Sequence, residues 1–533
     1  MAARPRSPSA VCLAALVALL AGICQGDFIR VQNGVFVQDD CREWLFSGYN
    51  TWQPIEMALD MCCGGRDGLN GQFAEAARNN LNVVRFFGFP ALRGFNLQTR
   101  PGQYTEQAFV GIDRVIAAAS DHGLKVLIAL TNNWNYNDLQ TDWKCSYTNW
   151  SSSATQCDDF FSDRGAIQMY KDHVRTFLGR INTVNGRTYS QDQTILGWNL
   201  INEPRSAKPN GAAEVQAWVA ELAPYVKALA PQQLITIGED GFYQASNCEA
   251  AYINPVNNGG GGSWPMQTGQ DFLPNHAVDG IDFAGMHLWP DNWQRTDMHW
   301  SQNWIWSHLV WAERRLGKPL VLEEYGKDVG YYNGDQTSPY QTFTDQWQHY
   351  RQTYDVAAMS LQQGRGLKGI MFWHWAGVDD NAPNGEGSTI FSYSGVWRDI
   401  IVPHSGMVAG YNANASRPLD APADPAALAQ PAAPVPAAAP SDAPVRDGAA
   451  RNVVPGAVAG AGRRTGPNLQ WATSGTATQA PAVAPIDPVT PTISVTPPAV
   501  AQPVIADAPA PSRIGAALAF VTVLPAALRL IHM

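Results

Sequence analysis

Two glutamates each follow an apolar run, where their carboxyl groups could do acid–base chemistry. Glu203 follows residues 196–202, and Glu324 follows residues 319–323. A carboxylic acid that protonates a leaving oxygen, opposite a carboxylate that attacks an anomeric carbon, is the pair that cleaves glycosidic bonds. Because a single glutamate is as often an ion-pair or capping residue, the interpretation depends on both glutamates facing one another across one site.

The separation of the two carboxyl groups decides the outcome of such a reaction. At about 5–5.5 Å the second carboxylate acts as the nucleophile, and the anomeric configuration is retained. The nearby negative charge would also raise the pKa of the acid, which keeps it protonated near neutrality. We therefore expect Glu203 and Glu324 to lie this close together.

Other polar and aromatic residues stand at the ends of further apolar runs, where they could hold a substrate. They are Arg85, Asn132, Asn133, Trp134, Asn202, His287, Trp289, Trp373 and Trp375. Tryptophans are often packing residues, and for Trp375 and Trp293 packing is at least as good an interpretation as sugar contact. The sequence contains no HExxH motif or comparable ligand cluster, so we predict no metal site and no cofactor.

These residues can meet only if the strands that carry them end side by side. Eight short apolar runs predict strands at 44–49, 82–89, 125–131, 195–201, 234–238, 282–288, 319–324 and 369–375. Amphipathic stretches predict helices between most of them, such as 105–122, 166–180, 213–229 and 304–316. This alternation favours an α/β fold, the (β/α)8 TIM barrel, whose strand ends converge on one face. An open doubly wound sheet is the alternative, but no glycine-rich phosphate turn follows the first strand.

Two segments closely resemble signatures of glycoside hydrolase family 5, whose members are (β/α)8 enzymes. The run Leu-Gly-Trp-Asn-Leu-Ile-Asn-Glu-Pro-Arg (196–205) resembles the family's Asn-Glu-Pro signature. The run Pro-Leu-Val-Leu-Glu-Glu-Tyr-Gly (319–326) resembles its nucleophile strand. The resemblance implies that Glu203 is the acid/base and Glu324 the nucleophile. Glu323 should then point away from the same face by strand alternation.

The resemblance extends to further positions, one by one. Asn202 resembles the asparagine that hydrogen-bonds the sugar 2-hydroxyl, and Arg85 resembles the arginine that keeps the nucleophile ionised by lowering its pKa. Trp373 resembles the aromatic floor under the −1 sugar, and His287 matches the histidine of a His-x-Tyr motif. The tyrosine of that motif, which donates a hydrogen bond to the nucleophile, is Trp289 here. An indole N–H donates from a different place, so the role of Trp289 stays open and another hydroxyl could replace it.

Segments outside these signatures are most similar to the endo-β-mannanase branch of the family. They are residues 97–104, 109–134, 158–161 and 170–174, and the likeness covers residues 28–412. In this branch Trp134 resembles a sugar-stacking residue of the cleft. The resemblance implies endo-hydrolysis of β-1,4 bonds in mannan, glucomannan or galactomannan. The nearest alternative is a cellulase-type β-1,4-glucanase, and an inactive wall-anchored carbohydrate-binding protein is an alternative from another class. A transglycosylating activity would show as longer products.

The composition restricts the class of partner. The formal net charge of −10 argues against nucleic acid, which would require a basic patch. The 19 tryptophans suit contact with sugar rings, although burial explains most of them. We therefore expect a β-mannan-type polysaccharide as the partner of a monomeric protein.

The two ends of the chain differ from the region between them. Residues 1–26 predict a secretory signal, because positive charge precedes a short apolar run. Residues 27–412 would form the catalytic barrel, and the Pro- and Ala-rich residues 413–512 predict a disordered stalk. The apolar residues 513–533 favour a glycolipid-anchor signal or a weak membrane anchor, although they are short for a bilayer. We expect a secreted, extracellular protein, attached to a membrane or wall through its C-terminus.

Removal of the predicted signal leaves six cysteines: Cys41, Cys62, Cys63, Cys145, Cys157 and Cys248. An even number in an oxidising compartment favours disulfides over zinc, for which no paired CxxC motif is present. The sequence does not choose among the pairings, and Cys145 with Cys157 is the most local candidate. Glycosylation motifs at Asn149 and Asn414 fit a secreted glycoprotein.

Overall fold

The computed structural model describes the folded region of the chain in nine stretches. They are residues 28–38, 41–135, 141–255, 264–295, 297–329, 331–332, 335–336, 342–377 and 387–415. All of them belong to a single compact unit. The predicted signal at 1–26, residues 416–512 of the predicted stalk and the apolar residues 513–533 lie outside the described residues, so these remain predictions. Among the described residues, no helix is both long and apolar enough to cross a bilayer.

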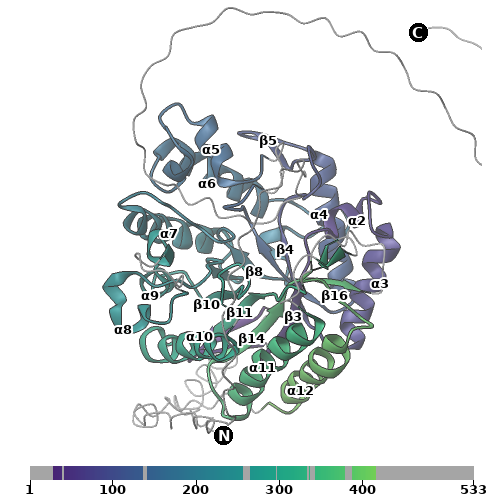
Figure 1. The fold of residues 1–533 in the computed structure, drawn as a ribbon. Coiled ribbons are helices and arrows are strands. Elements are labelled where there is room, and N and C mark those ends of the chain that lie inside the picture. The colour runs from purple at the N-terminus through teal and green to yellow at the C-terminus, as the bar shows by residue number, and fades with distance from the viewer. Residues whose placement is uncertain are drawn as a thin grey trace, which may run out of the picture. The chain divides into compact units, whose positions relative to one another are not determined.

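Eight parallel strands form the centre of the fold (Figure 1). They are β3 (Phe46–Asn50), β4 (Val83–Phe87), β7 (Lys125–Ala129), β8 (Ile195–Asn199), β9 (Leu234–Thr236), β10 (Ala284–Leu288), β11 (Leu320–Tyr325) and β14 (Leu367–Phe372). Their order in the sheet, β10-β11-β14-β3-β4-β7-β8-β9, follows the chain around a circle. Between β9 and β10 the backbone N–H of Asp282 donates to Ile235 (2.8 Å), and that of His287 to Asp240 (3.1 Å). All eight predicted strands and the predicted (β/α)8 barrel are confirmed.

Helices surround these strands, as Figure 1 shows. They are α2 (Pro54–Ala58), α3 (Gly65–Arg78), α4 (Glu106–Asp121), α5 (Lys144–Trp150), α6 (Arg164–Leu178), α7 (Gly211–Leu229), α8 (Cys248–Ala251), α9 (Phe272–His276), α10 (Met298–Trp311), α11 (Phe343–Gln362) and α12 (Val402–Asn414). The four predicted helices correspond to α4, α6, α7 and α10, and α10 continues as a π-helical turn, Ala312–Leu316. Short strands outside the barrel pair as β1 (Arg30–Gln32) with β2 (Val35–Val37), β5 (Gln98–Arg100) with β6 (Gln103–Tyr104), β12 (Tyr331–Tyr332) with β13 (Asp335–Gln336), and β15 (Trp375–Gly377) with β16 (Ile390–Phe391).

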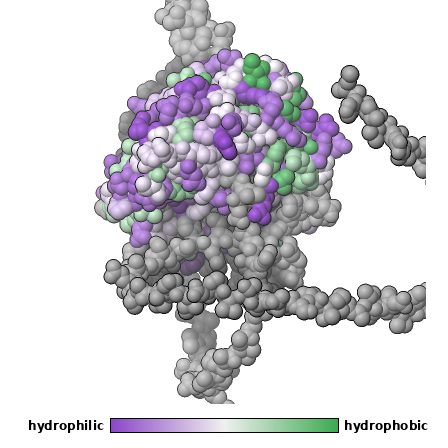
Figure 2. Space-filling model, turned by 90° about the horizontal axis from the view of Figure 1, so that it is seen from above, coloured by the Kyte–Doolittle hydropathy of each residue, from purple (hydrophilic) through white to green (hydrophobic). Residues whose placement is uncertain are grey.

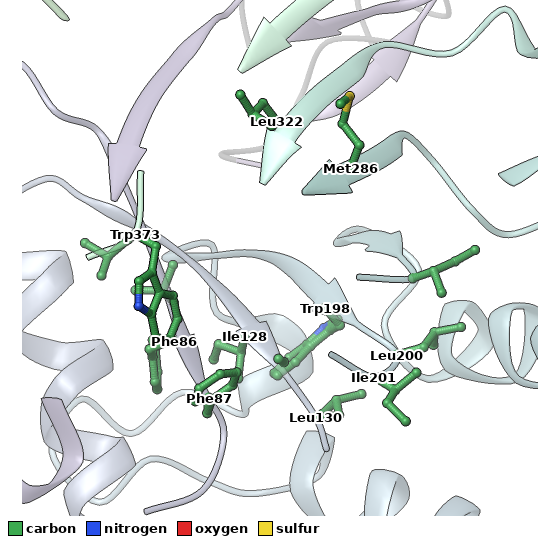
Figure 3. Close-up of a cluster of buried hydrophobic side chains, with 14 of the residues drawn as sticks. Phe86, Phe87, Ile128, Leu130, Trp198, Leu200, Ile201, Met286, Leu322 and Trp373 are labelled. Carbon is green, nitrogen blue, oxygen red and sulfur yellow. The ribbon is translucent and has the colours of Figure 1, made fainter. Parts of the chain in front are cut away.

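The larger hydrophobic core fills the space between the strands and their helices. Trp198 is fully buried there, and its indole N–H donates to Gln233 (2.8 Å). Figure 3 shows Trp198 near Ile128 and Phe87. Replacement of such a residue by alanine typically costs about 3–5 kcal/mol of stability, because a cavity remains. On the surface drawn in Figure 2, the coloured part is mostly hydrophilic and its apolar residues form small patches.

A second apolar cluster contains residues from all eight barrel strands or from positions directly beside them. It includes Phe46, Val83, Leu127, Leu196, Leu234, Phe283, Val321 and Met371. Two residues further along several of these strands, the side chains become polar, as at Arg85 and Glu323. Alternation along a strand places residues i and i+2 on one side. The barrel interior therefore changes from an apolar layer to a polar layer toward the carboxyl ends of the strands.

A disulfide fixes the segment that follows the third barrel strand. Cys145 in α5 is bonded to Cys157, the candidate pairing that the sequence analysis named. A disulfide that closes a short loop of this kind stabilises a fold by about 2–4 kcal/mol. Beside it, the Lys144 ammonium pairs with Asp158 (2.6 Å). A second disulfide joins the adjacent residues Cys62 and Cys63.

Glu239, just after β9, is a fully buried carboxyl group. Its side chain accepts a hydrogen bond from the Asn275 amide (2.5 Å), and burial raises the pKa of Glu239 to about 8. The folded protein therefore favours the neutral form, whereas the unfolded chain ionises near its ordinary pKa. Stability that depends on Glu239 is present at acidic pH and is lost as the pH rises through about 8.

Replacement of Glu239 by glutamine should remove this pH dependence, because the amide cannot ionise. We expect Glu239→Gln to melt on the order of 2–4 °C above the wild-type protein at about pH 9, and to show a smaller difference at about pH 5. Thermal unfolding followed by circular dichroism at both pH values measures this. A difference that is the same at both pH values would contradict the assignment.

Candidate active site

The two glutamates singled out in the sequence lie together at the carboxyl ends of the fourth and seventh barrel strands. Glu203 comes four residues after β8, and its backbone N–H donates to Gly238 (2.7 Å). Its φ of 50° lies in the left-handed region, a strained conformation that clusters at functional sites. One carboxylate oxygen of Glu203, one of Glu324 and one ring nitrogen of His287 all lie within 4.8 Å of one another. The fold thus brings residues 203 and 324 into opposition.

Each oxygen of the Glu324 carboxylate accepts a hydrogen bond from a nitrogen donor. The Arg85 guanidinium donates to Oε2 (2.7 Å), and the Trp289 indole N–H donates to Oε1 (2.8 Å). The sequence left the role of Trp289 open, and the structure shows that its indole N–H reaches the Glu324 carboxylate. Gly326 provides the space, because a Cβ at this position would lie 2.2 Å from a carbon of the indole.

The Glu203 carboxyl group is held in the same manner by two other rings. The Trp134 indole N–H donates to Oε2 (2.6 Å), and Nδ1 of His287 lies 2.9 Å from Oε1. Burial lowers the pKa of His287 to about 4. His287 is therefore neutral above this pH, and its contact with Glu203 adds no positive charge.

The charge of Glu324 results from opposing effects. Burial raises the pKa of Glu324, because the carboxylate loses its hydration. The Arg85 charge and the Trp289 hydrogen bond act in the opposite direction, whereas the Glu203 charge adds to the rise. Arg85 thus lowers the pKa of Glu324 as expected, but it does so against a larger desolvation effect.

Arg85 is a fully buried guanidinium that three amide side chains hold in place. It donates to Asn199 from Nε (2.9 Å), to Asn50 from Nη1 (2.9 Å) and to Asn202 from Nη2 (2.7 Å). Asn202, a predicted substrate-binding residue, therefore lies at the site. Its amide also donates to Asn132 (3.1 Å). Asn50 and Asn199 were missed in the sequence, although a polar residue inside an apolar run is a usable signal.

A β-bulge in β11 decides where Glu323 and Glu324 point. Leu322 is paired with Met286, and Glu324 with His287, so Glu323 has no opposite residue in β10. The Glu323 carboxyl accepts a hydrogen bond from Asn199 (3.0 Å), which also contacts Arg85. The prediction that Glu323 points away from the site is therefore wrong. Glu323 follows Val321 into the barrel interior, and the bulge turns Glu324 toward the same region.

The predicted aromatic residues divide into those beside the carboxyl groups and those in the core. Trp373 packs edge-on against Trp289, with ring centroids 6.1 Å apart, and it is 9% exposed. Trp375 instead stacks on Trp397 (4.5 Å), and Trp293 is buried against Trp304 (5.4 Å). The packing interpretation of Trp375 and Trp293 is thus confirmed.

Arg205, at the end of the Asn-Glu-Pro-Arg segment, is a neighbour of the site to which the sequence assigned no role. Its guanidinium lies 4.9 Å from the ring centre of Trp134, the predicted sugar-stacking residue. It also pairs with Asp240 (2.6 Å), whose pKa burial raises to about 6. Arg205 therefore covers part of Trp134 with a charged planar group.

Glu203, His287 and Glu324 are also, within the described residues, the group whose atoms lie close enough to hold a metal ion. All four oxygens of the two carboxyl groups already face nitrogen atoms. The fixed positive charge of Arg85, 2.7 Å from Glu324, opposes a second cation. The donor set therefore fits acid–base chemistry better than metal binding.

A (β/α)8 barrel with two glutamates in opposition at the ends of its fourth and seventh strands has the arrangement of a retaining glycoside hydrolase. A family model described as glycoside hydrolase family 5 beta-mannosidase-like matches residues 26–395. The chain belongs to this family. The resemblance that the Asn-Glu-Pro and Glu-Tyr-Gly segments carried is confirmed.

Relatives and solved structures agree with this membership. The chain is 35% identical to mannan endo-1,4-beta-mannosidase 3 of Oryza sativa subsp. japonica over 402 residues, 72% of this chain and 81% of that protein. It is 32% identical to mannan endo-1,4-beta-mannosidase 1 of Arabidopsis thaliana over 357 residues, 66% of this chain and 82% of that protein. The endo-beta-1,4-mannanase of Thermotoga petrophila matches with 25% identity and a TM-score of 0.55, covering 68% of this chain and 77% of that structure.

The indole of Trp289 provides a direct test of the donors around Glu324. Its hydrogen bond lowers the pKa of Glu324, so Trp289→Phe should raise that pKa and move the acid limb of kcat/KM to higher pH. We expect turnover to fall about 10–100-fold. Trp289→Tyr, which restores a hydroxyl donor, should recover part of the activity. An acid limb that does not move in Trp289→Phe would show that the indole is only a packing residue.

Proposed function

We propose that the chain is an endo-acting, retaining glycoside hydrolase that cleaves internal β-1,4-mannosidic bonds. The single observation that carries the proposal is the opposition of Glu203 and Glu324, whose nearest oxygens lie within 4.8 Å. Carboxyl groups of inverting enzymes stand about 6.5–9.5 Å apart, because a water molecule must fit between the sugar and the base. The shorter separation supports direct attack by a carboxylate.

In the first step, a Glu324 oxygen attacks the anomeric carbon while Glu203 donates its proton to the departing glycosidic oxygen. The glycosidic bond breaks, and a glycosyl ester forms on Glu324. In the second step, Glu203 removes a proton from water, which attacks the same carbon and releases Glu324 as a carboxylate. Two inversions give net retention, and Glu203 regains its proton in the second step.

The surrounding residues support this cycle in distinct ways. Arg85 keeps Glu324 ionised before attack, and the neutral His287 orients the Glu203 carboxyl group. Trp373, beside Trp289, would form the floor under the −1 sugar. Asn202 would bind the sugar 2-hydroxyl through the remaining N–H of its amide, since its oxygen accepts from Arg85.

The substrate class is supported by relatives rather than by a residue of the site. Several curated relatives are named mannan endo-1,4-beta-mannosidases, and a solved Thermotoga petrophila structure is an endo-beta-1,4-mannanase. The site residues are shared with β-glucanases of the same family, so glucan is the competing substrate. Endo action on a mannan-type polysaccharide is therefore our proposal.

The roles of the two glutamates can be separated by substitution. Glu324→Ala should lose turnover by at least about 10³-fold and still bind mannohexaose, because only the nucleophile is removed. Glu203→Ala should also lose turnover of mannohexaose, but with an aryl β-mannooligosaccharide, whose leaving group needs no proton, azide should restore turnover and give a β-mannosyl azide, since a small anion needs no general base. Glu239→Gln, another buried carboxyl outside the site, serves as the control and should stay active. Substantial turnover in Glu324→Ala would refute the mechanism.

The products identify the substrate and the stereochemistry together. With mannohexaose we expect internal cleavage to shorter oligosaccharides, and NMR of the fresh products should show the β-anomer first. Activity on purified mannan should exceed activity on carboxymethyl-cellulose. Preference for the glucan would replace the mannanase proposal with a β-glucanase, whereas an α-anomer would reject retention.

We also propose that the protein is secreted and that its C-terminal segment attaches it to a surface. The Cys145–Cys157 and Cys62–Cys63 disulfides support export, because disulfides persist in oxidising compartments. Fractionation of expressing cells, with and without a phospholipase that cleaves glycolipid anchors, tests both parts.

A further inference from the structure

Glu323 is a buried carboxyl group that the proposed reaction does not use. It is fully buried, and its Oε1 accepts one hydrogen bond, from the Asn199 amide (3.0 Å). Its Oε2 has no hydrogen-bond partner among the described residues. This oxygen lies against the backbone of Gly285, where a Cβ would come within 2.3 Å of it. The barrel therefore reserves space for this side chain but offers it a single donor.

Asn199 connects Glu323 to the reacting carboxylate. The Asn199 oxygen accepts from Nε of Arg85 (2.9 Å), and Nη1 of Arg85 donates to Glu324 (2.7 Å). A second link passes through Asn50, whose amide donates to the backbone oxygen of Glu323 (2.9 Å) and accepts from Arg85 (2.9 Å). Glu323 is thus linked through Asn199 and Asn50 to the guanidinium that binds the nucleophile.

The orientation of the Asn199 amide depends on its partners. Because Glu323 is an acceptor, it fixes the NH2 end of Asn199 toward itself and leaves the oxygen for Arg85. Without that acceptor the amide is free to turn, and its NH2 end would then face the Nε–H of Arg85, donor against donor. Loss of one hydrogen bond at Glu323 would therefore release the guanidinium from its position against Glu324.

The charge state of Glu323 follows from the groups that surround it. The charged groups that face it are Arg85 from β4 and Glu324 from its own strand, while β3, β8 and β10 present Asn50, Asn199 and Gly285. One neutral amide cannot offset the desolvation of an ionised carboxylate. Burial accordingly raises the pKa of Glu323 to about 7. A neutral Glu323 does not compete with Glu324 for the positive charge of Arg85.

We propose that Glu323 is a positioning residue that acts through Asn199 to hold the Arg85 guanidinium against Glu324 while adding no negative charge beneath the site. The inference rests on the proposed function, because it assigns Glu324 as the nucleophile. It explains why the strand carries two successive glutamates with different tasks. The first orients an arginine through an amide, and the second reacts.

The experiment compares Glu323→Ala, Glu323→Gln and the matched pair Glu239→Ala and Glu239→Gln on mannohexaose. Glu323→Ala should lower kcat about 10–100-fold with little change in KM and should move the acid limb of kcat/KM to higher pH, because Arg85 is released. Glu323→Gln keeps the acceptor oxygen and should restore most of kcat, with the acid limb at the wild-type position. The Glu239 variants should leave the acid limb unmoved.

Four outcomes would overturn the inference. An acid limb that shifts to lower pH in Glu323→Gln would mean that Glu323 is ionised in the wild-type protein, because removal of a negative charge lowers the pKa of Glu324. A Glu323→Ala variant with wild-type kcat, or a loss that glutamine does not rescue, would reject the orienting role. Infrared difference spectra at about pH 6 should show the C=O band of a protonated carboxyl group in the wild-type protein and its loss in Glu323→Gln, and an absent band would reject neutrality.

Glu324→Ala in the same series separates this inference from the proposed function. Turnover retained by Glu324→Ala would refute the proposed function itself, whatever the Glu323 variants show. If Glu324→Ala loses turnover and the Glu323 variants behave like the wild-type protein, the proposed function stands and only the positioning role is rejected.

Discussion

The buried ion pair between Arg85 and Glu324 is the interaction on which the rest of the site depends. Removal of two charges from water costs several kcal/mol for each ion, and only good geometry with further hydrogen bonds offsets this cost. Here three asparagines, Asn50, Asn199 and Asn202, accept hydrogen bonds from three further N–H groups of the guanidinium. The strands must therefore carry amides at this level of the barrel, directly above an apolar layer.

One fixed cation organises several acidic groups with different tasks. Glu324 lies against the guanidinium, Glu203 is hydrogen-bonded to two uncharged rings, and Glu323 lies deeper with one amide donor. Since His287 is neutral, it adds no further positive charge beside Glu203. Identical side chains thus acquire different properties from burial and from the charge of their neighbours.

The sequence was sufficient for the elements and for the reacting pair, because both have local signals. Apolar runs that end in polar residues predicted all eight strands and placed Glu203, Glu324 and Arg85 at one end of the barrel. The bulge in β11 had no such signal, since it arises from pairing with β10, and strand alternation therefore misplaced Glu323. Asn199 was missed although it interrupts an apolar run, because its importance lies in contacts with residues distant in the chain.

Because Trp289 lies so close to Gly326, the residue that fits at position 289 depends on the residue at position 326. A tryptophan fits at 289 only while 326 has no side chain, because even a methyl group would overlap the indole. A side chain at 326 would therefore push the indole away, and with it the N–H that donates to Glu324. A substitution at 326 would act on the nucleophile through Trp289.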